Sequence, residues 1–373
     1  IVASGDAALK NQATPVEVFV NKSQPNELTA TYQVNFNFAR AVTLDDDVAK
    51  TWGEDASPWS VRHAMQFPGA LKWFNNVNGV QYAYMGDAFI QEHDLDMSQR
   101  IARDYKFNES FSGVYDGSGF KIENSHSCCL NADGKGYAVG LNMGLFPKVS
   151  GATLKNVNVV VRGVQEIDMA SAVKVNFGVL IGYIEGTAVL EACSVQGEQN
   201  ISDDSVPILK LTGVGNTSPY FGTLIGYSEG SVTMSRCEVK NLQFSLLPTA
   251  SSKEWNGGLN VGGLVGGYNG AFTPTDCKVD NWSFATSLPS KHVLSIGGYL
   301  GLGTGSMVVY AQNTVEKVSA TFSATQDDES KLHFGAFAGT LGAQSVMDGT
   351  FDEVSYRIGE NDAVSVAKPV GNG

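Results

Sequence analysis

The sequence lacks the features that mark several large classes of protein. Its 373 residues contain no run of 18 apolar residues, so no transmembrane helix or direct insertion into a membrane is predicted. Basic residues are also few: 25 Lys and Arg stand against 38 Asp and Glu, which gives a net charge of −13. Such a chain neutralises phosphates poorly and is repelled by anionic lipid. Nucleic acid is therefore not a predicted partner.

Cysteine is scarce as well. The count of 5 is odd, whereas secreted disulfide scaffolds use more cysteines, in even numbers. We therefore expect buried thiols. A disulfide between the neighbours Cys128 and Cys129 would be strained.

A glycine and cysteine pattern repeats three times. In "FGVLIGYIEGTAVLEACSV", "FGTLIGYSEGSVTMSRCEV" and "VGGLVGGYNGAFTPTDCKV", three glycines lie four residues apart and a cysteine follows seven residues later. A fixed spacing of this kind predicts a solenoid or an array. The residues are Gly178, Gly182, Gly186 and Cys193; Gly222, Gly226, Gly230 and Cys237; and Gly262, Gly266, Gly270 and Cys277.

Less regular copies flank these three. The cysteine position recurs near 313 and at 349, so successive steps are 44, 40, 36 and 36 residues. Upstream, Val157 takes that position in a shorter copy. The repeats are rich in Gly, Val, Thr, Ser and aromatic residues, which favour strands and turns over helices.

Alternation within each copy indicates strands with one buried face. In "SRCEVKN", Cys237 and Val239 point one way and the charged residues point the other. About three short strands per repeat, stacked on those of the next repeat, predict an all-β, right-handed parallel β-helix (solenoid) of about six coils. The glycines would allow tight bends and close backbone approach, the cysteines would form an internal column, and Asn241 and Asn281 would turn the chain.

These motifs together resemble the GLUG repeat of bacterial surface and secreted proteins. "FSGVYDGSGFKIEN" (111–124) is similar to the first-coil pattern of that family, and "MGLFPKVSGATLKNVNV" is similar to the segment that follows it. The resemblance covers roughly residues 57–358. It implies a right-handed β-helix and an extracellular or cell-surface location, and it implies no particular ligand.

Three parts are predicted along the chain: an N-terminal β-strand module (1–56), a helical cap and entry strand (57–104), and the β-helix (105–373). Within the cap, residues 57–79 are predicted to form a short helix, a break at Pro68–Gly69 and a second helix. "TYQVNFNF" alternates strictly, with Tyr32, Val34, Phe36 and Phe38 on one face, and could pair with "VEVFV" (16–20) as a hairpin. This strand is a candidate for assembly with another subunit. The alternative is that it packs on its own solenoid.

Catalytic, cofactor-binding and metal residues are not predicted. Many parallel β-helices degrade polysaccharides, but no Gly-His-Gly is present, and the pairs Asp203–Asp204 and Asp327–Asp328 lie in polar loops. Asp94, Asp96 and Asp116 are expected to cap turns, with a structural Ca²⁺ as the alternative. No cofactor is expected.

Two functions follow from these patterns. The first is a non-enzymatic, extracellular structural or adhesin-like protein, a subunit of a surface filament or layer, whose partner is itself, another surface protein or a cell-surface glycan. The alternative is a glycan-binding or polysaccharide-degrading β-helix, in which aromatic residues such as Trp255, Tyr268 and Trp282 would form a sugar platform. Trp282 is expected to serve packing instead.

Overall fold

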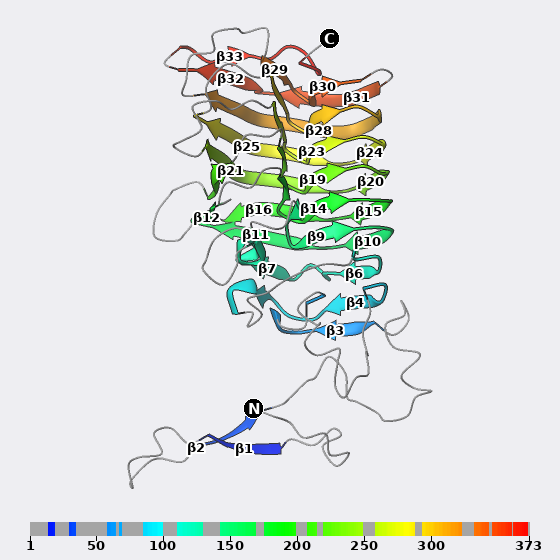
Figure 1. Cartoon of the computed structure of the whole chain (residues 1–373), viewed down its shortest axis with the longest axis vertical. Helices are drawn as coiled ribbons and strands as arrows, with labels where there is room; N and C mark the ends of the chain where they lie inside the picture. Colours follow the sequence, from blue (N-terminus) through cyan, green and yellow to red (C-terminus); the bar gives the residue numbers. More distant parts are fainter. Residues whose placement is uncertain are drawn as a thin grey trace.

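The computed structural model describes residues 14–18, 30–34, 58–64, 67–68, 85–99, 110–129, 142–168, 175–198, 207–214, 219–248, 258–287, 293–322, 332–342, 345–359 and 361–371. Most of these residues are in strands, and the described part includes two short 3-10 helices, η4 (Met97–Gln99) and η5 (Ser125–Cys129). The strands stack into a right-handed parallel β-helix (Figure 1), as the repeat pattern predicts.

Two sheets of six parallel strands form one side of the solenoid. The first sheet contains β8 (Asn142–Met143), β13 (Asn176–Gly178), β18 (Tyr220–Gly222), β22 (Leu259–Gly262), β26 (Leu294–Gly297) and β29 (Leu332–Gly335). The second sheet contains β9 (Phe146–Val149), β14 (Ile181–Ile184), β19 (Ile225–Ser228), β23 (Val265–Tyr268), β27 (Leu300–Gly303) and β30 (Ala338–Leu341). Each strand of the first sheet runs through a two-residue bend into the second, so β8 and β29 lie five turns apart.

The third sheet closes each coil and carries the cysteine positions. Its middle strands are β10 (Ala152–Lys155), β11 (Asn158–Arg162), β12 (Val164–Asp168), β15 (Ala188–Glu191), β16 (Ser194–Glu198), β17 (Ile208–Val214), β20 (Val232–Ser235), β21 (Glu238–Pro248), β24 (Ala271–Thr275) and β25 (Lys278–Thr286). β28 (Ser306–Phe322), β31 (Ser345–Asp352) and β32 (Ser355–Ile358) follow, and β33 (Val364–Ser365) pairs with β32 in the antiparallel sense.

The third sheet begins well before the first full coil. β3 (Trp59–Val61), β4 (Ala88–Gln91), β5 (Leu95–Asp96), β6 (Val114–Asp116) and β7 (Lys121–Glu123) extend it in parallel register. The prediction of a short helix starting at residue 57 is therefore wrong. Trp59 and Val61 are buried, and Ser60 between them is half-buried; this alternation with a period of two is typical of a strand. The segment forms a strand because it pairs with β4. The second predicted helix, which follows the break at Pro68–Gly69 and carries Leu71, Phe74 and Val77, lies outside the described residues.

A continuous core fills the solenoid from Trp59 to Ile358. Its aromatic residues stack between coils: the ring centroids of Phe177 and Phe221 lie 6.4 Å apart, and those of Phe244 and Phe284 lie 6.2 Å apart. No single coil could bury these rings alone, because each coil contributes only one layer of side chains. The fold is therefore held together by contacts between repeats.

The predicted N-terminal hairpin is present in the backbone. β1 (Thr14–Val18) and β2 (Ala30–Val34) pair in the antiparallel sense, with Val16 opposite Tyr32 and Thr14 opposite Val34. Phe36 and Phe38 lie outside the described residues, as do Asp203–Asp204 and Asp327–Asp328.

Candidate binding face and the repeat columns

The repeated glycines lie where two backbones meet. A Cβ atom on Gly226 would lie 2.5 Å from the carbonyl oxygen of Gly182 one coil earlier, and a Cβ atom on Gly266 would lie equally close to that of Gly226. A Cβ atom on Gly230 would overlap the carbonyl oxygen of Gly186. Real Cβ atoms do not approach backbone atoms this closely, so the stacking of coils requires glycine at these positions. The same crowding holds at Gly178, Gly222, Gly262 and Gly270.

The three repeat cysteines form a column inside the third sheet. Cys193, Cys237 and Cys277 are free thiols and at most 1% exposed. The residues that follow them, Ser194, Glu238 and Lys278, are register partners in adjacent strands. Hydrogen bonding between the Cys237 thiol and the Cys193 thiol, together with burial, raises the pKa of Cys237 well above its ordinary value. Cys128 and Cys129 are also buried, and they form no disulfide.

The column continues with different side chains at its ends. Val157 precedes it, and Asn313 and Gly349 follow it in register. Asn313 is fully buried, and both ends of its amide are hydrogen-bonded to the coil below: Oδ1 accepts from the backbone N–H of Cys277 at 2.8 Å, and Nδ2 donates to the carbonyl of Pro274 at 3.0 Å. A polar residue is tolerated in this apolar column because its partners are satisfied.

Asn241 and Asn281 adopt the left-handed conformation predicted for turn residues, with φ angles of 52° and 50°. The Asn281 side chain donates from Nδ2 to Oδ1 of Asn241 at 3.0 Å, one coil away. These residues let the long strands of the third sheet change direction while the stacking continues.

Of the three aspartates near the first coil, Asp96 and Asp116 cap turns, as expected, whereas Asp94 bonds to Lys121 in the next coil. Asp96 accepts a hydrogen bond from the backbone N–H of Ser98 at 3.0 Å, and Asp116 accepts one from the backbone N–H of Ser118 at 2.8 Å. Asp94 accepts a hydrogen bond from the backbone N–H of Lys121 at 2.8 Å. Within the described ranges, no group of three or more His, Cys, Asp or Glu side chains is placed to hold a metal ion.

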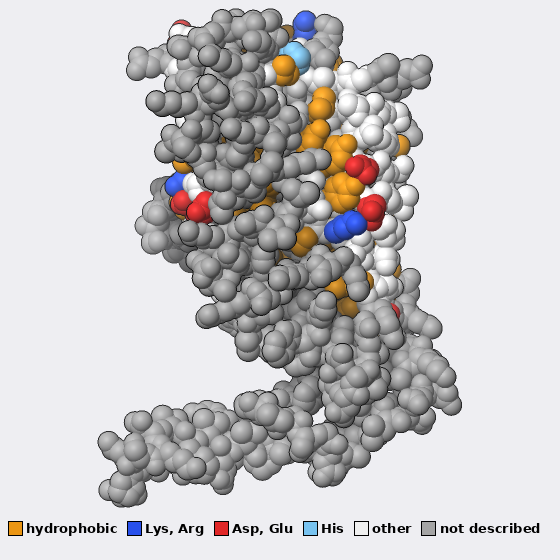
Figure 2. All heavy atoms as spheres, viewed as in Figure 1, with side chains coloured by type: hydrophobic (Ala, Val, Ile, Leu, Met, Phe, Trp, Pro, Cys, Tyr) orange, Lys and Arg blue, Asp and Glu red, His pale blue; other side chains and the backbone are white. Residues whose placement is uncertain are grey.

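The outward side of the second sheet carries an aromatic stripe. Lys148, Tyr183, Tyr227, Gly267, Leu302 and Thr340 are successive register partners along it. The Tyr183 and Tyr227 rings are stacked with centroids 6.2 Å apart, and Tyr220 of the first sheet lies 4.4 Å from Tyr227. All three tyrosines are partly exposed. An apolar stripe with charged side chains beside it is visible along the solenoid in Figure 2.

We call the surface formed by Tyr183, Tyr220 and Tyr227 the tyrosine face. Charged residues border it. Lys148 pairs with Glu185 at 2.8 Å, and Glu185 and Glu229 are exposed at equivalent positions in adjacent coils. Partial burial, and then hydrogen bonding to the Glu229 carboxylate, raise the pKa of Tyr183 above its ordinary value of 10.0. Burial also raises the pKa of Tyr220 and of Tyr227. The tyrosine face is thus a partly apolar surface with hydroxyl and carboxylate groups at its rim.

The sugar platform predicted from the sequence does not form from the residues named for it. Tyr268 and Trp282 are both 1% exposed, and the Trp282 indole donates to Thr223 Oγ1 at 3.0 Å inside the core. Trp255 lies outside the described residues. The sequence did not lead us to predict that Tyr183 and Tyr227 lie on the surface. The motif "GYxEG" nevertheless occurs in both "IGYIEG" and "IGYSEG", with a tyrosine and a glutamate at equivalent positions of two coils.

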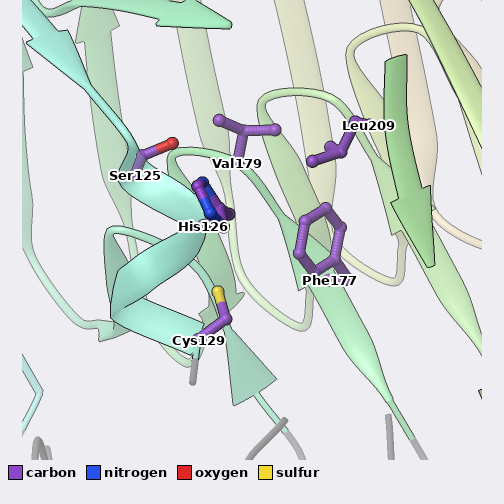
Figure 3. A pocket seen from close by; sticks show the side chains of 6 residues that line it. All are labelled: Ser125, His126, Cys129, Phe177, Val179 and Leu209. Atoms are coloured by element: carbon purple, nitrogen blue, oxygen red, sulfur yellow. The ribbon is translucent and has the colours of Figure 1, made fainter. Parts of the chain in front are cut away.

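A small recess lies between η5 and the first sheet (Figure 3). Ser125, His126, Cys129, Phe177, Val179 and Leu209 line a space of about 170 Å³, part of it open to solvent. Burial lowers the pKa of His126, and the neighbouring Gln165 side chain opposes this effect. Pockets for small molecules span about 300–1,000 Å³, so this recess is a packing gap rather than a ligand site.

The described part of the chain holds no helix of the length and apolar character needed to span a bilayer. No protein-family model, no curated protein and no solved structure matches this chain.

Proposed function

We propose that this protein is a non-enzymatic structural or adhesin-like repeat protein that works outside the cell or at its surface, as a subunit of a surface filament or layer. The observation that carries the proposal is the in-register stacking of three parallel sheets around one continuous core. Such a stack is a stiff rod that presents the same kind of side chain at fixed intervals along its length. The resemblance to GLUG repeats supports the extracellular location.

The direct test is electron microscopy of cells from the native source, labelled with antibodies against the purified protein. We expect label on the outer surface, on filaments or on a layer. Label confined to the cell interior would contradict the proposal. In parallel, the purified protein should leave pectin, alginate and chitin intact, with or without Ca²⁺; release of reducing or unsaturated ends would instead support the polysaccharide-degrading alternative.

The N-terminal strand is the proposed assembly element. Its partner would gain main-chain hydrogen bonds from β2, and Tyr32, Val34, Phe36 and Phe38 would supply the apolar contacts. Deleting residues 1–45 distinguishes pairing between subunits from packing on the chain's own solenoid. In the first case the truncated chain keeps its melting temperature and loses higher-order species in light scattering; in the second it melts much earlier.

A second candidate function is glycan binding, and the tyrosine face favours it. Apolar C–H groups of a sugar ring pack on aromatic rings, and sugar hydroxyls donate hydrogen bonds to carboxylates such as Glu185 and Glu229. Titration with neutral oligosaccharides, followed by saturation-transfer NMR, tests this role. Binding should be lost in the double variant Tyr183→Ala/Tyr227→Ala and kept in Thr233→Ala, an exposed control on the third sheet. No binding by the parent protein would remove this candidate.

A further inference from the structure

The end of the chain carries a copy of the repeat that the glycine and cysteine spacing does not reveal. "VSVAKPVG" (364–371) aligns with "LNVGGLVG" (259–266), "LSIGGYLG" (294–301) and "LHFGAFAG" (332–339). The shared order is apolar, polar, apolar, small, two bend residues, apolar and glycine. In the three earlier copies this stretch forms a strand of the first sheet, the bend and the start of a strand of the second sheet.

The second half of this copy occupies the position of a further coil. The N–H groups of Tyr299 and Leu300 both donate to the Phe337 carbonyl at 2.9 Å, and those of Phe337 and Ala338 donate to the Pro369 carbonyl at 2.9 and 3.0 Å. Val370 bridges Ala338 in the parallel sense. The bend at Lys368–Pro369 thus repeats the hydrogen bonding of the bends below it.

Gly371 extends the glycine column of the second sheet. A Cβ atom on Gly371 would lie 2.5 Å from the backbone nitrogen of Phe334, as a Cβ atom on Gly301 would lie 2.5 Å from that of Val261. Equivalent crowding recurs at Gly339, against Ile296. Residues 368–371 are therefore in the register of a coil, with the spacing that each earlier coil has.

The first half of the copy leaves that register. Val364 and Ser365 pair with Tyr356 and Ser355 of β32 in the antiparallel sense, and the Val366 N–H donates to the Val354 carbonyl at 2.8 Å. Val364 is 47% exposed there. Among the described strands, β29 pairs with β26 alone, so its outer edge carries no strand partner.

Ala367 stands where the coils below have glycine. In the coils below, the equivalent residue is glycine, because a Cβ atom there would overlap the carbonyl oxygen three residues later, as it would at Gly262 with Val265 and at Gly335 with Ala338. In the coil register the Ala367 methyl would meet the Val370 carbonyl in the same way. The methyl therefore opposes the tight turn from the first sheet into the second.

We propose that the outer edge of β29 is a docking surface for Val364–Ala367, and that the Ala367 methyl holds this segment off the edge. In the docked arrangement, Val364 lies beside Leu332, Ser365 beside His333 and Val366 beside Phe334. The connection must be more extended than in the coils below: Ser365 follows Ile358 by seven residues, whereas Tyr220 follows Leu211, which is in register with Ile358, by nine. Docking covers an edge that a strand of another molecule could otherwise pair with.

Cross-linking of the full chain tests this proposal, since the native cysteines are buried. The pair Ser355→Cys/Ser365→Cys reports the antiparallel arrangement, and the pair His333→Cys/Ser365→Cys reports the docked one. We expect the first pair to cross-link more in the parent chain. Adding Ala367→Gly should raise the yield of the second pair about tenfold, the factor that relief of about 1.4 kcal/mol gives.

Ala363→Gly is the matched control, because it adds a glycine outside the aligned stretch and should leave both yields unchanged. Hydrogen exchange gives an independent measurement: Ala367→Gly should slow exchange at Leu332–Gly335. An unchanged yield of the His333–Ser365 cross-link in the folded Ala367→Gly variant would overturn the proposal. A dimeric cross-linked product would also overturn it, by identifying a second copy as the occupant.

Discussion

The side-chain oxygen of Asn313 accepts the backbone N–H of Cys277, one coil below, at 2.8 Å. Asn313 holds the position that cysteine holds in three other coils. Tyr299 adds a hydroxyl that donates to the Cys277 carbonyl, and the Thr314 carbonyl oxygen lies 3.3 Å from the same hydroxyl. The repeat column thus changes from thiols to a hydrogen-bonded amide without interruption of the sheet.

Asn313→Ala should lower the free energy of unfolding by about 2–6 kcal/mol. The substitution leaves the Cys277 N–H and the Pro274 carbonyl buried without partners, and each such group costs about 1–3 kcal/mol. Urea unfolding measures the effect, with the exposed Thr321→Ala as the control. Equal stability of the two variants would show that water or another group satisfies these atoms.

Cys237 should react slowly with a thiol reagent in the native protein at pH 8.5 and rapidly after unfolding. The thiolate is the reactive form, and both burial and the raised pKa of Cys237 keep it protonated. Cys237→Asp should destabilise the fold by several kcal/mol, because it buries an unpaired charge. Rapid labelling of the native chain at Cys237 would contradict the buried column.

Gly230→Ala should destabilise the protein by about 3 kcal/mol or more, at the upper end of the cost of overpacking. The added methyl overlaps the backbone of Gly186, which cannot move without separating two coils. Gly86→Ala is the control, since its Cβ atom would lie 3.4 Å from the Ser112 hydroxyl. Thermal unfolding compares them, and a similar melting temperature for both would refute backbone crowding as the reason for the glycine.

Stability should fall as the pH rises above about 9, because the buried Cys237 and Cys277 thiols keep protons that the unfolded chain loses, and the tyrosines steepen the decline from about pH 10. Tyr183, Tyr220 and Tyr227 have raised pKa values in the folded state, so the folded chain keeps protons that the unfolded chain loses from pH 10.0 upward. Tyr183→Phe should show a shallower decline between pH 9 and 11 in urea unfolding, because it removes one of these groups. An identical slope in the variant would mean that Tyr183 titrates normally.

Much of the fold followed from the sequence. The spacing of Gly226, Gly230 and Cys237, repeated at fixed offsets, predicted stacked strands, and the alternation around Cys237 predicted which side chains are buried. These patterns can be recognised in the sequence because each coil packs on its neighbours in the same way and so needs the same residue types at the same positions. Asn241 and Asn281 were predicted to turn the chain for the same reason.

Other features depended on neighbours that a linear pattern does not reveal. Trp59–Val61 forms a strand because it pairs with β4, although the local sequence pattern indicated a helix. Trp282 and Tyr183 are both aromatic residues within the repeats. Trp282 is in the core and Tyr183 is on the surface, because their side chains lie on opposite faces of their sheets.

The sequence by itself determined the repeat, the strand periodicity and the need for glycine and small buried residues, because these are consequences of local geometry and of one period. Only the tertiary structure decided that Tyr183, Tyr220 and Tyr227 share a face, that Asn313 bonds across coils and that Val364 pairs with β32 instead of β29. Each of these depends on which backbones lie side by side, and a linear pattern does not contain that information.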